Sequence, residues 1–144
     1  MYFCKCYHGD SPDNNTHKKK NMKQLLMMTL FTALFCHCGS KESVKTLGVA
    51  EFATVIERPE VRLIDVRTAA EYAEGHLAGA ENIDVKRDDF AERIQDIKGP
   101  VAVYCRGGKR SLKAAGQLAA QGCTVYNLDG GILAWQKAGR PTTK

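Results

Sequence analysis

One cysteine of this 144-residue chain is followed by two glycines and three basic side chains, a set of residues that can build a nucleophile. The segment reads Cys105-Arg106-Gly107-Gly108-Lys109-Arg110-Ser111. Glycines let the backbone curl around the sulfur, so that several N–H groups point inward and form an anion site. Nearby cations and such N–H groups lower the pKa of a thiol. Cys105 is therefore predicted to be a thiolate nucleophile at neutral pH.

Each residue of this loop has an expected role. Cys105 would attack a donor and hold the transferred group covalently. The N–H groups from Arg106 to Ser111 would stabilise the negative charge. The side chains of Arg106, Lys109 and Arg110 would attract an anionic donor, while Ser111 is expected to cap the following helix. In the alternative interpretation, Cys105 is only a small core residue that precedes a simple turn. This alternative does not explain why three cations follow it.

The flanking segments place this cysteine between a strand and a helix. Residues 100–104 are apolar and β-branched, which predicts a short buried strand. Residues 112–121 predict a helix whose inner face carries Leu112, Ala115, Leu118 and Ala119. The positive end of that helix would face the sulfur.

Strands and helices alternate through residues 44–140. Strands are predicted at 44–47, 61–66, 81–84, 100–104 and 124–128, and helices at 49–58, 68–74, from Asp88 or Asp89 through Ile97, 112–121 and 131–138. Thr68 is expected to cap its helix, with Glu71 completing a capping box. This order predicts an α/β fold with a central, mostly parallel five-stranded sheet and helices on both faces. Ligands bind beyond the carboxyl ends of such strands, where Cys105 lies.

A second group of polar residues, Asp65, Arg67 and Glu71, is expected to support the corner between strand and helix rather than to do chemistry. Arg67 and Glu71 have the spacing of a surface ion pair worth a few tenths of a kcal/mol. His76 and Trp135 are also predicted to be structural, and Trp135 would pack the last helix onto the sheet.

Six cysteines could suggest disulfides or a metal site, but only Cys105 and Cys123 fall within this domain. A disulfide framework is therefore not expected. Cys123 is predicted to fill the core, with a resolving thiol as the alternative. The segment Cys4-Lys5-Cys6-Tyr7-His8 looks like part of a metal site, yet no second ligand pair at zinc spacing follows, and no metal is expected.

Three motifs, in this order along the chain, resemble those of the rhodanese-like domain family. They are Leu63-Ile64-Asp65-Val66-Arg67 with Glu71-Tyr72 and residues 75–83, then the Cys105 loop, then residues 126–135. The resemblance covers about residues 44–139 and implies a rhodanese-like fold and a single-domain sulfurtransferase. It implies that Cys105 takes the outer sulfur of a donor such as thiosulfate as a persulfide, without a cofactor. A small thiol, cyanide or a relay protein would accept the sulfur.

Two other functions stay open. A sulfur-relay module would carry the persulfide with little turnover of free thiosulfate. A cysteine phosphatase is less favoured, because phosphatases of this kind place five residues between the cysteine and the arginine. Only four residues separate Cys105 from Arg110, so the cup suits a single sulfur better than a phosphate.

The first forty residues are expected to be a leader. Residues 1–21 are interpreted as an over-extended start, and residues 22–40 as a secretory or lipoprotein-type signal with a short spacer. The apolar run of this signal, residues 25–35, is much shorter than the roughly 20 residues of a spanning helix. Cys38, or else Cys36, resembles the lipid-modified cysteine of bacterial lipoproteins, although neither follows the usual small residue.

The leader predicts a place in the bacterial cell envelope or periplasm, with lipid anchoring to the membrane as one outcome. If the leader is not functional, the domain is expected in the cytoplasm. Residues 1–40 hold five lysines and two aspartates, a net +3 of the chain's +5. The domain has no basic helix face, so nucleic acid is not an expected partner.

Overall fold

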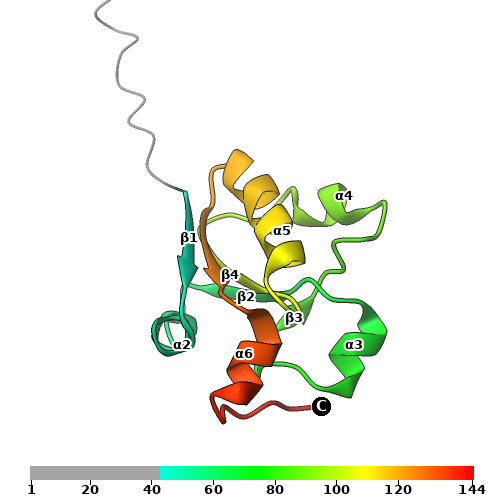
Figure 1. Cartoon of the computed structure of the whole chain (residues 1–144). Coiled ribbons are helices and arrows are strands. Elements are labelled where there is room, and N and C mark those ends of the chain that lie inside the picture. Colours follow the sequence, from blue (N-terminus) through cyan, green and yellow to red (C-terminus); the bar gives the residue numbers. More distant parts are fainter. Residues whose placement is uncertain (1–42) are drawn as a thin grey trace, which may run out of the picture. The chain divides into compact units, whose positions relative to one another are not determined.

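A parallel five-stranded sheet forms the centre of residues 43–144, the part of the chain that the computed structural model describes (Figure 1). The strands are β1 (Val44–Leu47), β2 (Arg62–Asp65), β3 (Glu81–Asn82), β4 (Pro100–Tyr104) and β5 (Thr124–Leu128). Their order in the sheet is β1-β5-β4-β2-β3, and every neighbouring pair is parallel. The expected leader, with Cys36 and Cys38, lies outside the described residues.

Helices cover both faces of the sheet (Figure 1). They are α2 (Val49–Ile56), α3 (Ala69–Glu74), α4 (Phe90–Ile94), α5 (Lys109–Ala120) and α6 (Gly131–Lys137). Side chains of α4 and α5 pack with Val101 and Val103 on one face, while α2 and α6 pack with Ala102 and Tyr104 on the other. This alternation along β4 follows from the two-residue period of a strand. The predicted α/β fold is confirmed.

The strand that leads to the candidate nucleophile, β4, is buried on both faces. From Val101 to Tyr104 every residue of β4 is fully buried, as expected for a strand covered on both faces. On the α6 side, Trp135 meets Phe52 edge to face, with the ring centres 6.4 Å apart. Trp135 therefore packs the last helix onto the sheet, as predicted.

Several details of the predicted helices are wrong. Helix α5 begins at Lys109, three residues before the predicted start, and Leu112 is 52% exposed instead of facing the core. The buried face carries Ser111, Ala114, Ala115 and Leu118. Helix α4 ends at Ile94, and the Asp89 carboxylate at its start accepts hydrogen bonds from Arg87 rather than from the helix.

The segment after α3 is held by the end of the described chain. His76 and Thr143 form an antiparallel bridge, and the His76 ring stacks on Tyr72 with centres 3.7 Å apart. The Trp135 indole N–H donates to the Pro141 carbonyl. These contacts give His76 a structural environment away from Cys105. Within residues 43–144 no helix is both long and apolar enough to cross a membrane.

Candidate active site

Cys105 lies directly after β4, at the carboxyl edge of the sheet, and is only 1% exposed. The Gly108 amide donates to its Sγ at 3.1 Å, and the Ser111 hydroxyl lies 3.5 Å from the same atom. Gly108 has φ +95°, a left-handed conformation that glycine adopts without strain. This turn brings the Gly108 amide back toward the sulfur, so main chain and hydroxyl together form a cradle for Sγ.

The cradle controls the ionisation of Cys105. Burial by itself raises the pKa of this thiol, because a charged sulfur loses its hydration. Hydrogen bonds from the Ser111 hydroxyl and from the amides of Ser111, Gly107 and Gly108 oppose burial, and the net effect lowers the pKa of Cys105 below its ordinary value. A lower pKa supplies more thiolate at neutral pH, which a nucleophile needs.

Ser111 does not cap helix α5 as predicted, because Gly108 occupies the N-cap position. The Ser111 hydroxyl instead lies inside the first turn, fully buried, within hydrogen-bond distance of both the Gly108 carbonyl at 3.0 Å and the Cys105 sulfur at 3.5 Å. Its single proton can go to either acceptor, and a thiolate at Cys105 draws it toward the sulfur. Its oxygen is placed between that carbonyl and the sulfur. Ser111 therefore belongs to the cradle itself.

The three cations of the loop have different surroundings. Arg110 makes a two-pronged ion pair with Glu71, at 2.7 and 2.8 Å. Arg106 and Lys109 are exposed, and neither has a carboxylate within 4 Å among residues 43–144. Arg106 and Lys109 can thus meet an incoming anion, whereas Arg110 is engaged within the protein.

Glu71 connects helix α3 to the loop. Its carboxylate accepts from the backbone and hydroxyl of Thr68, which completes the predicted capping box, and from Arg110. The hydrogen bond from Arg110 is the main cause that lowers the pKa of Glu71 to about 2. The expected Arg67–Glu71 surface pair does not form. Glu71 pairs instead with a residue 39 positions away, a contact that sequence spacing alone could not reveal.

Asp65 and Arg67 form a buried ion pair at the corner between β2 and α3. The Arg67 guanidinium donates to both carboxylate oxygens of Asp65, the shortest contact being 2.6 Å, and to the Gly75 carbonyl at 2.7 Å. The Tyr104 hydroxyl, on the adjacent strand, accepts from the Leu77 amide. These hydrogen bonds link β2 to the end of α3, which is the supporting role expected of Asp65 and Arg67.

Helix α6 supports the loop from behind. The Ile132 amide donates to the Cys105 carbonyl at 2.8 Å, and the Leu133 amide donates to the Arg106 carbonyl at 3.2 Å. Gly131 has φ +60°, and a Cβ there would lie 2.6 Å from the Arg106 carbonyl oxygen and collide with that of Cys105. The contact of Gly131 with the backbone of Cys105 and Arg106 was not predicted from the sequence.

Cys123 lies at the other end of the sheet. Because Pro100 pairs with Thr124, Cys123 adjoins the start of β4 while Cys105 follows its end. The five residues of β4 therefore separate Cys123 from Cys105 by roughly 16 Å along the strand direction. A disulfide needs Cα atoms within about 7 Å, so the alternative role of Cys123 as a resolving thiol is wrong. Burial raises the pKa of Cys123, whose thiol donates to the Ile97 carbonyl.

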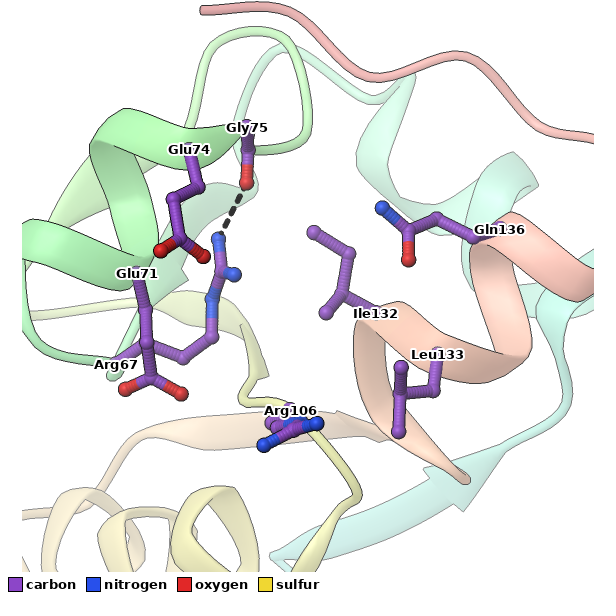
Figure 2. Close-up of a pocket in the computed structure, with 8 residues that line it drawn as sticks. All are labelled: Arg67, Glu71, Glu74, Gly75, Arg106, Ile132, Leu133 and Gln136. Carbon is purple, nitrogen blue, oxygen red and sulfur yellow. Dashed lines mark hydrogen bonds between the residues drawn. The ribbon is translucent and has the colours of Figure 1, made fainter.

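Two hollows meet at the loop. The first, the sulfur hollow, measures about 310 Å³ and is lined by Cys105, Arg106, Gly107, Lys109, Arg110 and Leu133. The second, here called the α3–α6 cleft, measures about 360 Å³ (Figure 2). It is lined by Arg67, Glu71, Glu74, Gly75, Arg106, Ile132, Leu133 and Gln136. Arg106 and Leu133 line both hollows. No group of three metal-ligating side chains occurs among residues 43–144.

The fold and the site together define an α/β domain with a candidate cysteine nucleophile in a main-chain cradle. Residues 48–138 match the family model of the rhodanese-like domain, and the chain belongs to this family. The family predicted from the three motifs is thus confirmed.

In several relatives, the part that aligns with this chain makes up most of the relative's length. The thiosulfate sulfurtransferase GlpE of Pseudomonas fluorescens is 39% identical over 88 residues, which are 60% of this chain and 80% of the relative. GlpE of Shewanella oneidensis is 35% identical over 99 residues, 67% of this chain and 96% of the relative. The crystal structure of a rhodanese-related protein from Thermoplasma volcanium superposes with a TM-score of 0.62 at 26% identity, covering 69% of this chain and 97% of that one.

Proposed function

We propose that this domain is a thiosulfate-type sulfurtransferase that works through a persulfide on Cys105. The observation that carries the proposal is the cradle around Sγ, where an amide and a hydroxyl meet a buried thiol whose pKa is lowered. Main-chain donors fixed in place stabilise negative charge as it develops on an atom. The similarity to two GlpE sulfurtransferases supports the same reaction class.

The first step would load the sulfur. The Cys105 thiolate attacks the outer sulfur of thiosulfate, and a bond forms between Sγ and that sulfur. The S–S bond of thiosulfate breaks, and its electron pair leaves with sulfite. The negative charge of the thiolate passes to the outer sulfur of the persulfide. Arg106 and Lys109, both exposed at the sulfur hollow, would attract the dianionic donor.

The second step would unload the sulfur. Cyanide or a thiolate attacks the outer sulfur of the persulfide, and a new bond forms between acceptor and sulfur. The Sγ–S bond breaks, and its electron pair returns to Sγ as thiolate. The products are thiocyanate or an acceptor persulfide, and the loop is ready for another donor. The atoms and charges balance without a cofactor.

The test compares the native chain with Cys105→Ala in a thiosulfate:cyanide assay and by intact mass. The native protein should form thiocyanate and gain 32 daltons with thiosulfate, and the variant should do neither. Cys123→Ala is the matched control, because that thiol lies at the opposite end of β4, and it should keep the activity. A Cys105→Ala protein with full activity would refute the proposal. Persulfide on Cys105 with negligible turnover would identify a relay module instead.

We also propose that residues 22–40 direct the domain to the bacterial cell envelope, with Cys38 or Cys36 as the site of a lipid. The support is the short lysine-preceded apolar run of the sequence. Intact mass of protein purified from its native host measures both cleavage and lipid. A full-length mass that includes residues 1–21 would refute the assignment of the leader.

A further inference from the structure

The α3–α6 cleft beside the sulfur hollow presents one unpaired charge of each sign (Figure 2). Glu74, the last residue of α3, and Arg106, in the loop, both line it, and neither has an ionic partner within 4 Å among residues 43–144. The remaining acid, Glu71, is already bound by Arg110 and Thr68. The free charges of the cleft therefore match a ligand that carries both an anion and a cation.

A buried arginine forms the back of the cleft. The Arg67 side chain is 6% exposed, and its Nε and Nη2 bind Asp65 and the Gly75 carbonyl. These contacts with Asp65 and Gly75 use Nε and Nη2 and leave Nη1, while the guanidinium also lies beside Tyr104, 5.8 Å from its ring centre. The Arg67 guanidinium, rigidly held, can therefore offer an N–H group to an anion in the cleft.

The opposite wall comes from helix α6. Figure 2 shows Ile132, Leu133 and Gln136 extending from α6 toward the side chains of α3. Leu133 is 50% exposed, and it also lines the sulfur hollow. A short apolar segment lying against Ile132 and Leu133 would thus lead from the cleft toward Cys105.

We propose that the α3–α6 cleft is the acceptor subsite and that it takes a small amino-acid thiol of the cysteine type. The carboxylate would bind Arg106 and Nη1 of Arg67, and the ammonium would bind Glu74. The carbon chain would lie on Ile132 and Leu133, with the thiol directed past Arg106 into the sulfur hollow. The cleft volume of about 360 Å³ suits a small ligand.

This proposal rests on the proposed function and names its acceptor. The outer sulfur of the Cys105 persulfide, anionic after loading, first takes a proton from the solvent, and the acceptor thiolate then attacks that sulfur. A bond forms between the two sulfurs, the Sγ–S bond breaks, and its electron pair returns to Sγ. The proton leaves with the transferred sulfur as the acceptor persulfide, and no oxidant or reductant is needed.

The test uses Glu74→Gln and three thiols: L-cysteine, cysteamine without the carboxylate, and 3-mercaptopropionate without the amine. For each thiol, kcat/KM of the variant is divided by that of the native chain, so differences in thiol reactivity cancel. The variant should lose about three- to fivefold with the two amines, as expected for a partly exposed ion pair. It should keep or gain activity with 3-mercaptopropionate, because a repelling carboxylate is removed.

The matched control is Glu60→Gln, an exposed acid in the turn before β2, at the opposite edge of the sheet from Cys105. It should leave all three ratios near one. Equal changes for all thiols in Glu74→Gln, or no change for any, would overturn the acceptor subsite. Thiosulfate:cyanide turnover should stay unchanged in Glu60→Gln.

A second measurement separates this proposal from the proposed function. S-methyl-L-cysteine cannot accept sulfur, and its titration should shift the amide NMR signals of Gly75 and Gln136 in the native chain and less in Glu74→Gln. Such shifts in a protein without sulfurtransferase activity would remove the acceptor role but keep the binding site. Full sulfurtransferase activity without these shifts would overturn the subsite alone.

Discussion

At the scale of single residues, Ser111 controls the candidate nucleophile more directly than any cation does. Its buried hydroxyl is the strongest of the interactions that lower the pKa of Cys105 against the opposing effect of burial. Arg106 and Lys109 are exposed and are screened by water. The ionisation of the thiol thus depends on hydrogen bonds from the loop, while in the proposed function the exposed charges would act on the incoming donor.

Ser111→Ala should raise the pKa of Cys105, because the largest opposing hydrogen bond is lost while burial remains. The thiolate exists above the pKa of the folded protein and disappears as the pH falls through it. The acid limb of thiosulfate turnover should therefore move to higher pH. Alkylation rates of Cys105 against pH measure this shift. An unchanged pH profile would contradict the role of Ser111.

Sequence alone predicted that the Cys105 loop lies between a strand and a helix and that main-chain amides of the loop face the sulfur, because loop, strand and helix are contiguous in the chain. The role of Cys105 as nucleophile stays a prediction. It could not predict the Glu71–Arg110 pair, since 39 residues separate the partners. It misplaced Ser111, because spacing cannot tell an N-cap from a first-turn residue when glycine occupies the cap. The α3–α6 cleft likewise depends on packing between segments distant in sequence.

At the scale of elements, the loop is held by two helices that approach it from different sides. Helix α5 begins within the loop, and helix α6 donates two amides to its carbonyls. The close approach of α6 requires that Gly131 have no side chain. The alternating pattern of the sequence predicted both helices, but their contact with the loop follows from the order of β4 and β5 in the sheet.

Gly131→Ala should destabilise the domain by at least about 2 kcal/mol, because the new Cβ meets two carbonyl groups and φ is left-handed. The sulfur cradle should loosen, and thiosulfate turnover should fall in the remaining folded protein. Gly116→Ala is the matched control on α5, where an added Cβ meets nothing within 4 Å. It should stabilise the domain by about 0.5–1 kcal/mol. Thermal unfolding distinguishes the two, and equal melting temperatures would contradict the packing described.

At the scale of the whole domain, positive charge collects around the mouth of the site. Arg106 and Lys109 line the sulfur hollow, while Lys86 and Lys113 line a neighbouring hollow with Arg110. Of these five only Arg110 has an ionic partner among residues 43–144. Such a concentration of unpaired cations attracts anions over distances comparable with the Debye length, about 10 Å at 0.1 M salt.

The value of kcat/KM for thiosulfate should therefore fall as ionic strength rises, while kcat at saturation changes little. Lys109→Gln should reduce both the rate at low salt and its dependence on salt. Lys45→Gln, on β1 at the far edge strand, is a control of equal charge and should leave the dependence unchanged. Steady-state rates between 50 and 500 mM salt, in the range where screening changes most, test this. Identical salt slopes in the two variants would contradict electrostatic attraction by this rim.

The sulfur atom is held by the Gly108 amide and the Ser111 hydroxyl, and neither contact uses a side chain of Gly107. A methyl group placed on Gly107 would touch nothing within 4 Å, and its φ lies outside the left-handed range. A side chain at this position would border the hollow that contains Cys105, without displacing the Gly108 amide or the Ser111 hydroxyl from the sulfur. Substitutions at Gly107 are therefore a way to change which sulfur donor the site prefers, one residue at a time.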